Sequence, residues 1–465
     1  MVFSSVIFLY IFLPIMLLIY FIVPKKIKNA IMILASFAFF AWGEIRYIGI
    51  MLILAVMDYF CGKGIDKAET KSKKKFYLMF DVIVNLLILF FFKYADFIIS
   101  SINDVTGLSI PLLHIPLPIG VSFNTFQSLS YIIDVYRGTV KCEKSFYNYL
   151  TYTTLFPQII AGPIVRYETV DEELVDKKIS VDNFAKGMKR FILGLAKKVL
   201  IANNIGKLWA YVEVMKFTNI DMLMGWIGII AFAFQIYFDF SGYSDMAIGL
   251  ANIFGMDFDE NFNYPYISKS ITEFWRRWHI TLGSWFRDYI YIPLGGNRKG
   301  FSKQIRNILV VWFLTGMWHG ASWNFILWGV YFGAILILEK LFILKILEQL
   351  PKFIRHLYAI FLILLGWVLF AFEDLTKVLS YLKAMFNFDN IASVDSIYYL
   401  RNYAVMFIIG IIFSIPFINS KFYKLEKSNK KSVAVLTTSV YIVLFIFSTA
   451  SLVSDTFNPF LYFRF

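Results

Sequence analysis

Cysteine and histidine are scarce in this chain. Its 465 residues include two cysteines, Cys61 and Cys142, and four histidines. No CxxC spacing and no cysteine–histidine cluster occurs, so the sequence gives no support to a disulfide framework, a zinc site or an attached haem. We therefore expect no bound metal or cofactor.

Charged side chains are few as well. Charged residues make up 17% of the sequence and hydrophobic residues 59%, whereas an average soluble domain has about 25% charged and about 45–50% apolar residues. So few charges cannot coat a globule of this size. Apolar runs of about 20 residues, long enough to cross the ~30 Å hydrocarbon core of a bilayer, recur along the chain. The composition therefore predicts an integral membrane protein.

The net charge of +13 has two interpretations. A basic chain can bind nucleic acid, but here Lys and Arg gather in short loops between apolar spans, as the positive-inside rule expects. We therefore expect membrane lipid, and no nucleic acid, as a partner. Basic loops follow the first and third spans and precede the last. Placing these loops in the cytoplasm puts both termini outside.

The first apolar segment, residues 6–23, lacks a basic amino-terminal region and a small-residue cleavage site, so we expect a retained first span. No internal repeat or low-complexity linker divides the chain, which predicts a single polytopic membrane domain over residues 1–465. Further spans are expected at about 29–44, 47–62, 76–99, 222–253, 307–321, 322–345, 356–372, 402–419 and 432–453.

Residues 115–220 follow a less regular pattern, because four prolines interrupt apolar segments that are too short to span. Irregular backbone at membrane depth persists only where it is buried in protein or lines a wet cavity. We therefore expect re-entrant elements around an internal site, with simple proline-kinked helices as the alternative. Residues 184–204 mix lysines with large apolar residues, which predicts a helix at the cytoplasmic interface.

An amphipathic helix is expected over residues 271–289, where aromatic and aliphatic residues form one face. Three tryptophans on that face are typical of the headgroup level of a bilayer. His279 lies at the edge of the face, beside Arg276. One interpretation is an interfacial helix whose histidine only forms a hydrogen bond. The other is the cytoplasmic mouth of a site for an anionic ligand.

The next residues, 291–298, read Y-I-P-L-G-G-N-R and predict a turn with a basic end. Backbone amides freed by Gly295 and Gly296, together with Arg298, would suit phosphate groups. The positive-inside rule explains the cations equally well.

A histidine in the following apolar helix is the most unusual residue of the sequence. His319 lies 13 residues after Arg306, which is about 20 Å along a helix. Ionisable residues at that depth are rare and mark functional sites by default. A buried histidine stays neutral, and neutral imidazole can act as a general base towards a hydroxyl. A histidine satisfied by a neighbouring helix, without chemistry, is the alternative.

Two further acids lie in the span at 222–253. Asp239 and Asp245 belong to the string D-F-S-G-Y-S-D. Acid, hydroxyl and glycine together predict a helix break that is pinned by hydrogen bonds, and structural support rather than catalysis.

These residues resemble a known family, the membrane-bound O-acyltransferases, and within it the bacterial branch of the alginate O-acetylation protein and the peptidoglycan O-acetyltransferase membrane subunit. The resemblance covers about residues 115–325, the motif-bearing core, and rests on several long strings in the family's order. The strings are L-P-I-G-V-S-F (117–123), F-P-Q-I-I-A-G-P-I-V-R (156–166), D-F-S-G-Y-S-D (239–245), F-W-R-R-W-H-I-T-L (274–282), W-F-R-D-Y-I-Y-I-P-L-G-G-N-R (285–298) and M-W-H-G (317–320).

The resemblance implies an all-α membrane fold of about 10–12 transmembrane helices with re-entrant and interfacial helices. It implies an acyltransferase in which His319 is the catalytic histidine and His279 is the second motif histidine. The donor would be acetyl-CoA entering from the cytoplasm. Its phosphates are expected near four cations, namely Arg276, Arg277, Arg287 and Arg298.

The carboxyl-terminal segment 455–465 is expected outside the membrane, as an aromatic tail. It resembles an F-x-Y-F ending (460–463) found in proteins of cell-envelope acylation, where the tyrosine is proposed to carry the acyl group. By analogy Tyr462 would accept acetyl near His319 and pass it outward. An aromatic anchor at the interface is the alternative.

The sequence therefore predicts an enzyme of the bacterial cytoplasmic membrane that moves acetyl groups to an extracytoplasmic polysaccharide. A separate secreted, hydrolase-like O-acetyltransferase is the expected partner. A D-alanyl transferase for teichoic acid is the nearer alternative. A proton-coupled transporter is the more distant one, and it predicts inverted repeats that the sequence does not display. The polysaccharide itself stays open.

Overall fold

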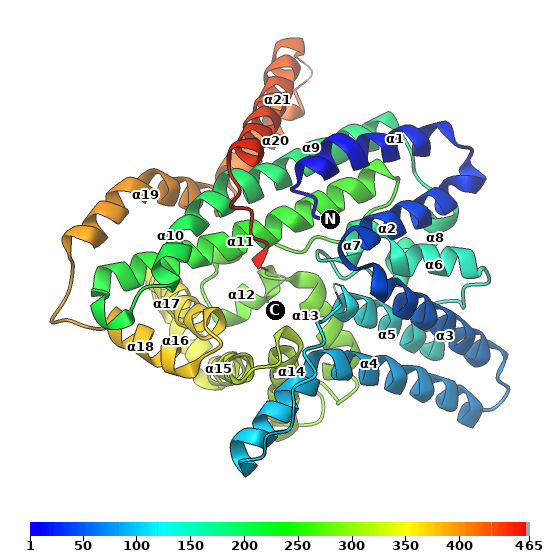
Figure 1. Ribbon diagram of the computed structural model, residues 1–465, viewed down its shortest axis with the longest axis horizontal. Helices are drawn as coiled ribbons and strands as arrows, with labels where there is room; N and C mark the ends of the chain where they lie inside the picture. The colour runs from blue at the N-terminus through cyan, green and yellow to red at the C-terminus, as the bar shows by residue number, and fades with distance from the viewer. Residues whose placement is uncertain (119, 429, 462–465) are drawn as a thin grey trace. The chain divides into compact units, whose positions relative to one another are not determined.

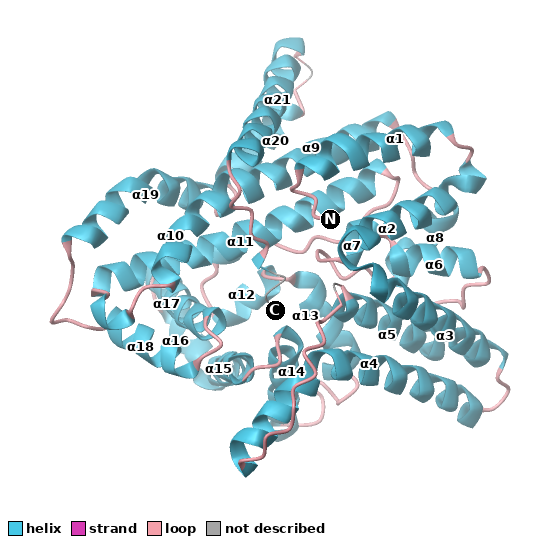
Figure 2. Ribbon diagram, viewed as in Figure 1, coloured by secondary structure: helices cyan, strands magenta, loops and turns pink. Residues whose placement is uncertain are grey.

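The computed structural model describes residues 1–118, 120–428 and 430–461, except for the side chains of Glu44 and Arg46. Within this part of the chain every regular element is a helix, and no strand forms (Figure 2). The predicted all-α class is confirmed. The helices pack into two compact units, and each is described by itself. The first contains Met1–Phe191 and Ser244–Asp259, and the second contains Ile192–Tyr243 and Glu260–Phe465.

The first unit begins with a π-helical turn and continues through short and long helices. Its helices are α1 (Leu13–Ile22), α2 (Lys28–Glu44), α3 (Ile48–Lys67), α4 (Lys71–Thr106), α5 (Val121–Arg137), α6 (Phe146–Thr154), α7 (Phe156–Ile159), α8 (Tyr167–Val175), most of α9 (Val181–Ala196) and the end of α11 (Met222–Ile253). Helices α3, α4 and α5 contact one another and lie side by side in Figure 1.

Polar side chains of α3, α4 and α6 form hydrogen bonds with one another. The Asn85 amide donates to the carboxylates of Asp58 and Asp81, at 2.9 and 3.2 Å. The Tyr149 hydroxyl donates to the other oxygen of Asp58, at 3.1 Å. All four side chains are buried. Hydrogen bonds of this kind offset the cost of removing polar groups from water.

The prolines of residues 115–166 interrupt the backbone as predicted. Pro157 lies in the first turn of the short helix α7, and residues 160–166 are not helical. Continuous kinked helices are therefore not what forms here. Two of the motif strings meet at Gly120, which has a φ of 80°, and a Cβ atom there would lie 2.1 Å from the carbonyl oxygen of Ile159. Only glycine fits this close approach.

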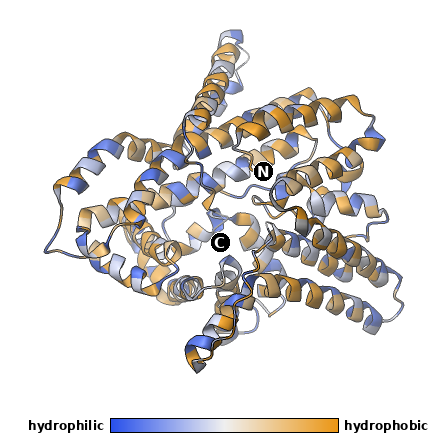
Figure 3. Ribbon diagram, viewed as in Figure 1, coloured by the Kyte–Doolittle hydropathy of each residue, from blue (hydrophilic) through white to orange (hydrophobic). Residues whose placement is uncertain are grey.

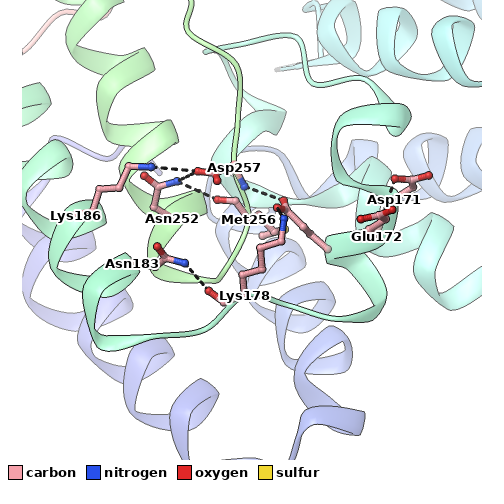
Figure 4. A network of polar contacts seen from close by, with 9 residues as sticks. Asp171, Glu172, Lys178, Asn183, Lys186, Asn252, Met256 and Asp257 are labelled. Atoms are coloured by element: carbon pink, nitrogen blue, oxygen red, sulfur yellow. Dashed lines mark hydrogen bonds and ion pairs between the residues drawn. The ribbon is translucent and has the colours of Figure 1, made fainter.

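A polar network joins the segment before α9 to the end of α11 (Figure 4). The Asp257 amide donates to the Glu173 carboxylate at 2.8 Å, and the Asp257 carboxylate accepts from Asn252 at 2.6 Å. Lys186 on α9 forms an exposed ion pair with Asp257 at 3.4 Å. The network fixes the chain where it leaves α11.

The second unit contains the end of α9, the first part of α11 and ten or more further described helices before and after it. These are α10 (Asn203–Glu213), α12 (Ile271–Arg277), α13 (Ile280–Phe286), α14 (Phe301–His319), α15 (Trp323–Leu338), α16 (Leu344–Gln349), α17 (Lys352–Ala371), α18 (Leu375–Met385), α19 (Val394–Phe413), α20 (Phe417–Glu426) and α21 (Lys431–Ser454). Aromatic residues dominate its core, including the fully buried Trp209, Trp328 and Trp367.

Helices α14 and α15 form a tight antiparallel pair. A Cβ atom on Gly316 would lie 2.4 Å from the carbonyl oxygen of Phe325, and a Cβ atom on Gly329 would lie 2.3 Å from that of Trp312. Small residues at such positions let two backbones approach closely in a membrane. This close contact fixes the end of α14, which carries His319.

In the part of the chain that the structure describes, six helices are long and apolar enough to cross a membrane by length and composition, namely α3, α4, α11, α17, α19 and α21. The apolar character of these helices is visible in Figure 3. The expected spans at 222–253 and 432–453 coincide closely with α11 and α21. The expected span at 402–419 is wrong in its bounds, since α19 begins eight residues earlier, behind the capping box of Ser393, and ends before Pro416. The expectation of about 10–12 transmembrane helices stays a prediction.

The expected helix break at the D-F-S-G-Y-S-D string is wrong. Helix α11 continues through it without interruption. Ion pairs hold both acids instead: Asp239 pairs with Lys198 at 2.8 Å, and Asp245 pairs with Arg190 at 2.6 Å. The predicted structural role of these acids agrees with such contacts. Lys198 is 3% exposed, so this lysine of the expected interfacial helix 184–204 lies inside the protein rather than at the membrane surface.

The Lys198–Asp239 pair holds the carboxyl-terminal tail. The Leu461 amide donates to the Asp239 carboxylate at 2.8 Å, and the Lys198 ammonium donates to the Pro459 carbonyl oxygen. Asn203 bonds to Asn458 at 3.1 Å, and Leu461 is 3% exposed. Figure 1 shows the tail, in red, running from α21 back to α11. The described part of the tail therefore packs into the core of the second unit.

Removing one partner of this buried pair is expected to destabilise the protein. Lys198→Met leaves the Asp239 charge uncompensated, which costs about 3–5 kcal/mol of unfolding free energy. Thermal unfolding of the detergent-solubilised protein measures the loss. The double variant Lys198→Met/Asp239→Leu should recover most of it, because replacing both ions by apolar groups is often neutral.

The matched control is Lys186→Met, which breaks the exposed pair with Asp257. Exposed ion pairs contribute about 1 kcal/mol or less. Equal losses for Lys198→Met and Lys186→Met would contradict the role given to the buried pair.

Candidate active site

The segment that carries His279 begins at the carboxylate of Glu339. The amides of Ile271 and Thr272, in the first turn of α12, donate to this carboxylate at 2.7 and 2.8 Å. The Thr272 and Tyr358 hydroxyls donate to it as well, at 2.6 and 3.2 Å. The first amides of a helix have no partner within the helix. Glu339, which is fully buried, supplies the missing acceptors and a charge that favours this end of the helix dipole.

The expected continuous helix over residues 271–289 is wrong. Helix α12 ends at Arg277, and His279 adopts a left-handed conformation with φ 46° before α13 begins at Ile280. At this break the Ile280 amide donates to the backbone carbonyl oxygen of Asn261 at 2.9 Å, in place of a carbonyl within the helix. The aromatic face packs inside the protein, since Trp278 and Trp285 are 4% and 3% exposed.

Hydrogen bonding from Asn261 fixes the state of the His279 ring. The side-chain oxygen of Asn261 accepts from Thr281 at 2.9 Å and lies 3.0 Å from Nδ1 of His279. An amide oxygen only accepts, so Nδ1 carries the proton and Nε2 does not. Burial lowers the pKa of His279 to about 3. The residue is therefore a neutral imidazole with a basic Nε2 at neutral pH. The left-handed backbone conformation of His279 is strained, and such strain clusters at functional sites.

His319 is the last residue of α14 and is 7% exposed. Aromatic rings surround it: its centroid lies 4.9 Å from Trp328 and 5.2 Å from Phe370. The Trp318 ring contacts both histidines, with centroids 4.9 Å from His319 and 6.0 Å from His279. The structure thus brings both predicted histidines into contact with one tryptophan ring.

A cavity of about 620 Å³ reaches His279 from a basic rim. Its walls are mostly apolar and aromatic, and they include Trp275, Trp278 and Trp312. Three cations line it, namely Arg276, Arg287 and Lys340. A mainly apolar cavity with a few convergent polar groups is the usual form of a small-molecule site.

The four arginines predicted from the sequence divide into two pairs. Arg276 and Arg287 line the cavity. Asp288 bonds to Arg287 at 2.7 Å and raises its pKa, so that side chain is firmly charged. Arg277 is held by Glu273 at 2.9 Å and by the Asn263 carbonyl oxygen at 3.1 Å. Arg298 is exposed on the turn after residue 291.

The expected phosphate cradle at the double glycine is wrong. The Gly295 amide donates to the Ile292 carbonyl oxygen and the Gly296 amide to that of Tyr291, both at 2.9 Å. The positive φ values of these glycines, 108° and 54°, close this turn upon itself. Its amides are used within the turn and do not point outward to a ligand.

Glu339, Lys340 and Asn261 were missed by the sequence reasoning. Glu339 and Lys340 lie in the apolar run 322–345, and an adjacent acid and base in such a run are themselves a signal of a functional site. Asn261 lies in a polar loop and offered no signal. Tyr462, the predicted acyl carrier, lies outside the described residues.

Replacing Glu339 is expected to loosen the start of α12. In Glu339→Gln the amide group cannot accept all four hydrogen bonds, and each buried donor that is left unsatisfied costs about 1–3 kcal/mol. The expected result is a lower unfolding temperature and faster tryptic cleavage after Arg276. Glu348→Gln, on the exposed side of α16, is the control. Cleavage at the same rate in both variants would show that Glu339 does not hold this segment.

Comparison with known proteins identifies the family. The model of MBOAT, the membrane-bound O-acyltransferase family, matches residues 139–382, which include both histidines. The chain is 37% identical to the probable alginate O-acetylase AlgI of Azotobacter vinelandii over the whole of both chains. It is 33% identical to the peptidoglycan O-acetyltransferase of Helicobacter pylori, over 84% of this chain and 81% of that one.

A more distant relative is the teichoic acid D-alanyltransferase of Bacillus subtilis, at 29% identity over 47% of this chain and 58% of that one. The resemblance noted from the motif strings is thereby confirmed. The chain belongs to the membrane-bound O-acyltransferase family and is a multi-pass membrane acyltransferase.

Proposed function

We propose that this protein transfers acetyl groups from cytoplasmic acetyl-CoA towards a cell-surface polysaccharide outside the bacterial cytoplasmic membrane. The observation that carries the proposal is the cavity with a cationic rim that reaches the buried, neutral His279. The relatives that match over most of their length are named for O-acetylation of alginate and of peptidoglycan. The relative named for D-alanyl transfer matches over less than half of the chain, which favours acetyl over D-alanyl as the group transferred.

The donor fits the charge pattern of the cavity. Arginine and lysine are the side chains that bind phosphate groups, and Arg276, Arg287 and Lys340 stand at the rim. The pantetheine arm of the donor would extend along the tryptophan-lined wall to the histidines. Arg298 remains a candidate for the outer phosphate, while Arg277 positions Glu273. Acetyl-CoA acts as a substrate, and no bound cofactor is proposed.

His319 is the proposed general base. The proton of an acceptor hydroxyl passes to His319 while its oxygen attacks the thioester carbonyl carbon. The carbon–sulfur bond then breaks, and the departing thiolate takes the proton from His319. His279 helps to position the thioester, since its Nδ1 proton is held by Asn261 and its Nε2 can only accept a hydrogen bond. General-base catalysis contributes about 10²–10⁴ in rate, and positioning of the activated thioester contributes the rest.

Tyr462 is the proposed first acceptor. The described tail reaches the core of the second unit at Leu461, held by Asp239, and Tyr462 is the next residue in the chain. Its phenol would receive the acetyl group and later yield it to a separate extracytoplasmic transferase of the secreted, hydrolase-like type. Both termini would lie outside, and the basic loops in the cytoplasm.

Removal of the imidazole tests the role of His319. We expect His319→Ala to lower acetyl transfer by about 10²–10⁴-fold, the range of general-base catalysis. The measurement is acetate released by mild alkali from the surface polymer of cells that carry the variant, at equal levels of membrane-inserted protein. His114→Asn, in an exposed loop, is the control. Full acetylation with His319→Ala would refute the catalytic role.

Removal of a single hydroxyl tests the carrier. Tyr462→Phe keeps the ring and removes the nucleophile, so polymer acetylation should fall to background while consumption of acetyl-CoA by water persists at a low rate. Tyr423→Phe, on the exposed helix α20, serves as the control. Undiminished polymer acetylation in Tyr462→Phe would reduce the tail to an anchor.

A further inference from the structure

A second and larger cavity lies in the second unit, apart from the one at His279. Its volume is about 780 Å³, and its long walls come from α11, α17 and α19. All three helices are apolar and long enough to cross a membrane. Ile227, Ile363 and Phe407 represent the side chains on the three walls. We call this cavity the lipid groove.

Polar groups gather at one end of the lipid groove. Lys269 and His356 line it, and so does Ser414. Ring nitrogen Nδ1 of His356 lies 3.1 Å from the Ser268 carbonyl oxygen, which only accepts, so Nδ1 donates. That hydrogen bond fixes the imidazole ring in the lining of the groove, which it shares with Lys269.

Two of these groups lack a protein partner in the described chain. Ser414 is 4% exposed, and its hydroxyl has no hydrogen-bond partner among the described residues. No carboxylate of the described chain forms an ion pair with Lys269, although the backbone amide of Lys269 donates to Glu273 at 2.9 Å. Glu273 itself is engaged by Arg277. A buried hydroxyl and a cation are thus left for a ligand with acceptor oxygens and negative charge.

The polar end faces one side of the membrane. His356 belongs to the first turns of α17, and Ser414 follows the end of α19, so both mark the same end of this antiparallel pair. Helix α20 begins three residues after Ser414 and carries Lys421 and Lys424. Under the positive-inside rule this end is cytoplasmic. That leaflet is the one that holds the anionic lipids of a membrane.

We propose that the lipid groove binds one anionic glycerophospholipid of the cytoplasmic leaflet. Its acyl chains would lie along α17 and α19, and its phosphate would contact Lys269 and His356. The Ser414 hydroxyl would donate to an ester or phosphate oxygen. The aliphatic walls match the apolar character of acyl chains, and the cationic end selects the charge of the headgroup.

The lipid would support the catalytic segment through Tyr266. This residue lines the groove, and its ring centroid lies 6.2 Å from those of both Phe274 and Trp278. The Tyr266 hydroxyl donates to the Ala233 carbonyl oxygen at 2.6 Å and accepts from the Trp367 indole at 3.1 Å. A filled groove would therefore hold Tyr266 against the residues that precede His279.

Lipid titration of the purified full-length protein tests the proposal. The probes are dioleoyl phosphatidylglycerol and dioleoyl phosphatidylcholine, and the readouts are bound lipid by native mass spectrometry and the unfolding temperature. We expect one saturable site that prefers phosphatidylglycerol. Lys269→Gln should weaken phosphatidylglycerol binding about fivefold, as expected for the loss of one lysine at a membrane surface. Lys345→Gln, exposed on α16, should not.

A second variant fills the groove without changing charge. Ala404→Phe, on the α19 wall, should abolish saturable binding of both lipids, whereas Ala434→Phe, exposed on α21, should leave it intact. Equal binding of both lipids to the unchanged protein would overturn the proposal, as would unchanged binding in Lys269→Gln and Ala404→Phe. A co-purifying polypeptide that occupies the groove in place of lipid would overturn it too. These outcomes depend on binding alone, so they remain distinct from the proposed acetyl transfer.

Discussion

The geometry of the candidate active site depends on the hydrogen bonds that the Glu339 carboxylate accepts from the start of α12. This carboxylate accepts from the first amides of α12, and because Glu339 is fully buried, bulk solvent does not reach it to take its place. Once that end is fixed, Trp275 and Trp278 are placed on the cavity wall and the chain must break at His279, where Asn261 takes over its backbone. The buried Lys198–Asp239 pair is a second example, because Asp239 also accepts a hydrogen bond from the Leu461 amide of the tail. Polar groups at depth are satisfied by the protein, and each such contact places a functional segment.

The all-α membrane class could be predicted from the sequence, because composition is a property of the chain alone. The sequence also singled out His279 and His319, which the structure brings to one tryptophan ring, and their catalytic roles stay predictions. The helix over 271–289 could not be predicted correctly. Its apolar residues recur at helical spacing throughout. The helix is interrupted by hydrogen bonds that Asn261 accepts, and Asn261 lies outside this range, so the spacing gives no sign of them. The helix break predicted at Asp239 is wrong for a similar reason. Its partner Lys198 lies 41 residues earlier in the sequence, and the contact between them is what allows the acid to lie in a continuous helix.

The two cavities of the second unit differ in the residues that line them. The cavity at His279 has a rim of three cations and tryptophan walls, which suit a phosphorylated thioester. The lipid groove has aliphatic walls and a single basic end, which suit a membrane lipid. Tyr266, Phe274 and Trp278 form continuous aromatic packing from the groove to the residue before His279. Such rigid packing can transmit the occupancy of one cavity to the geometry of the other.

If the cavity at His279 receives the acyl donor, an analogue of the donor should be found there. This can be measured in an experimental structure of the full-length protein with a thioether analogue of acetyl-CoA, which binds but cannot transfer. We expect the phosphates beside Arg276, Arg287 and Lys340 and the pantetheine arm along the tryptophan wall as far as His279. An analogue bound elsewhere, with this cavity empty, would contradict this expectation.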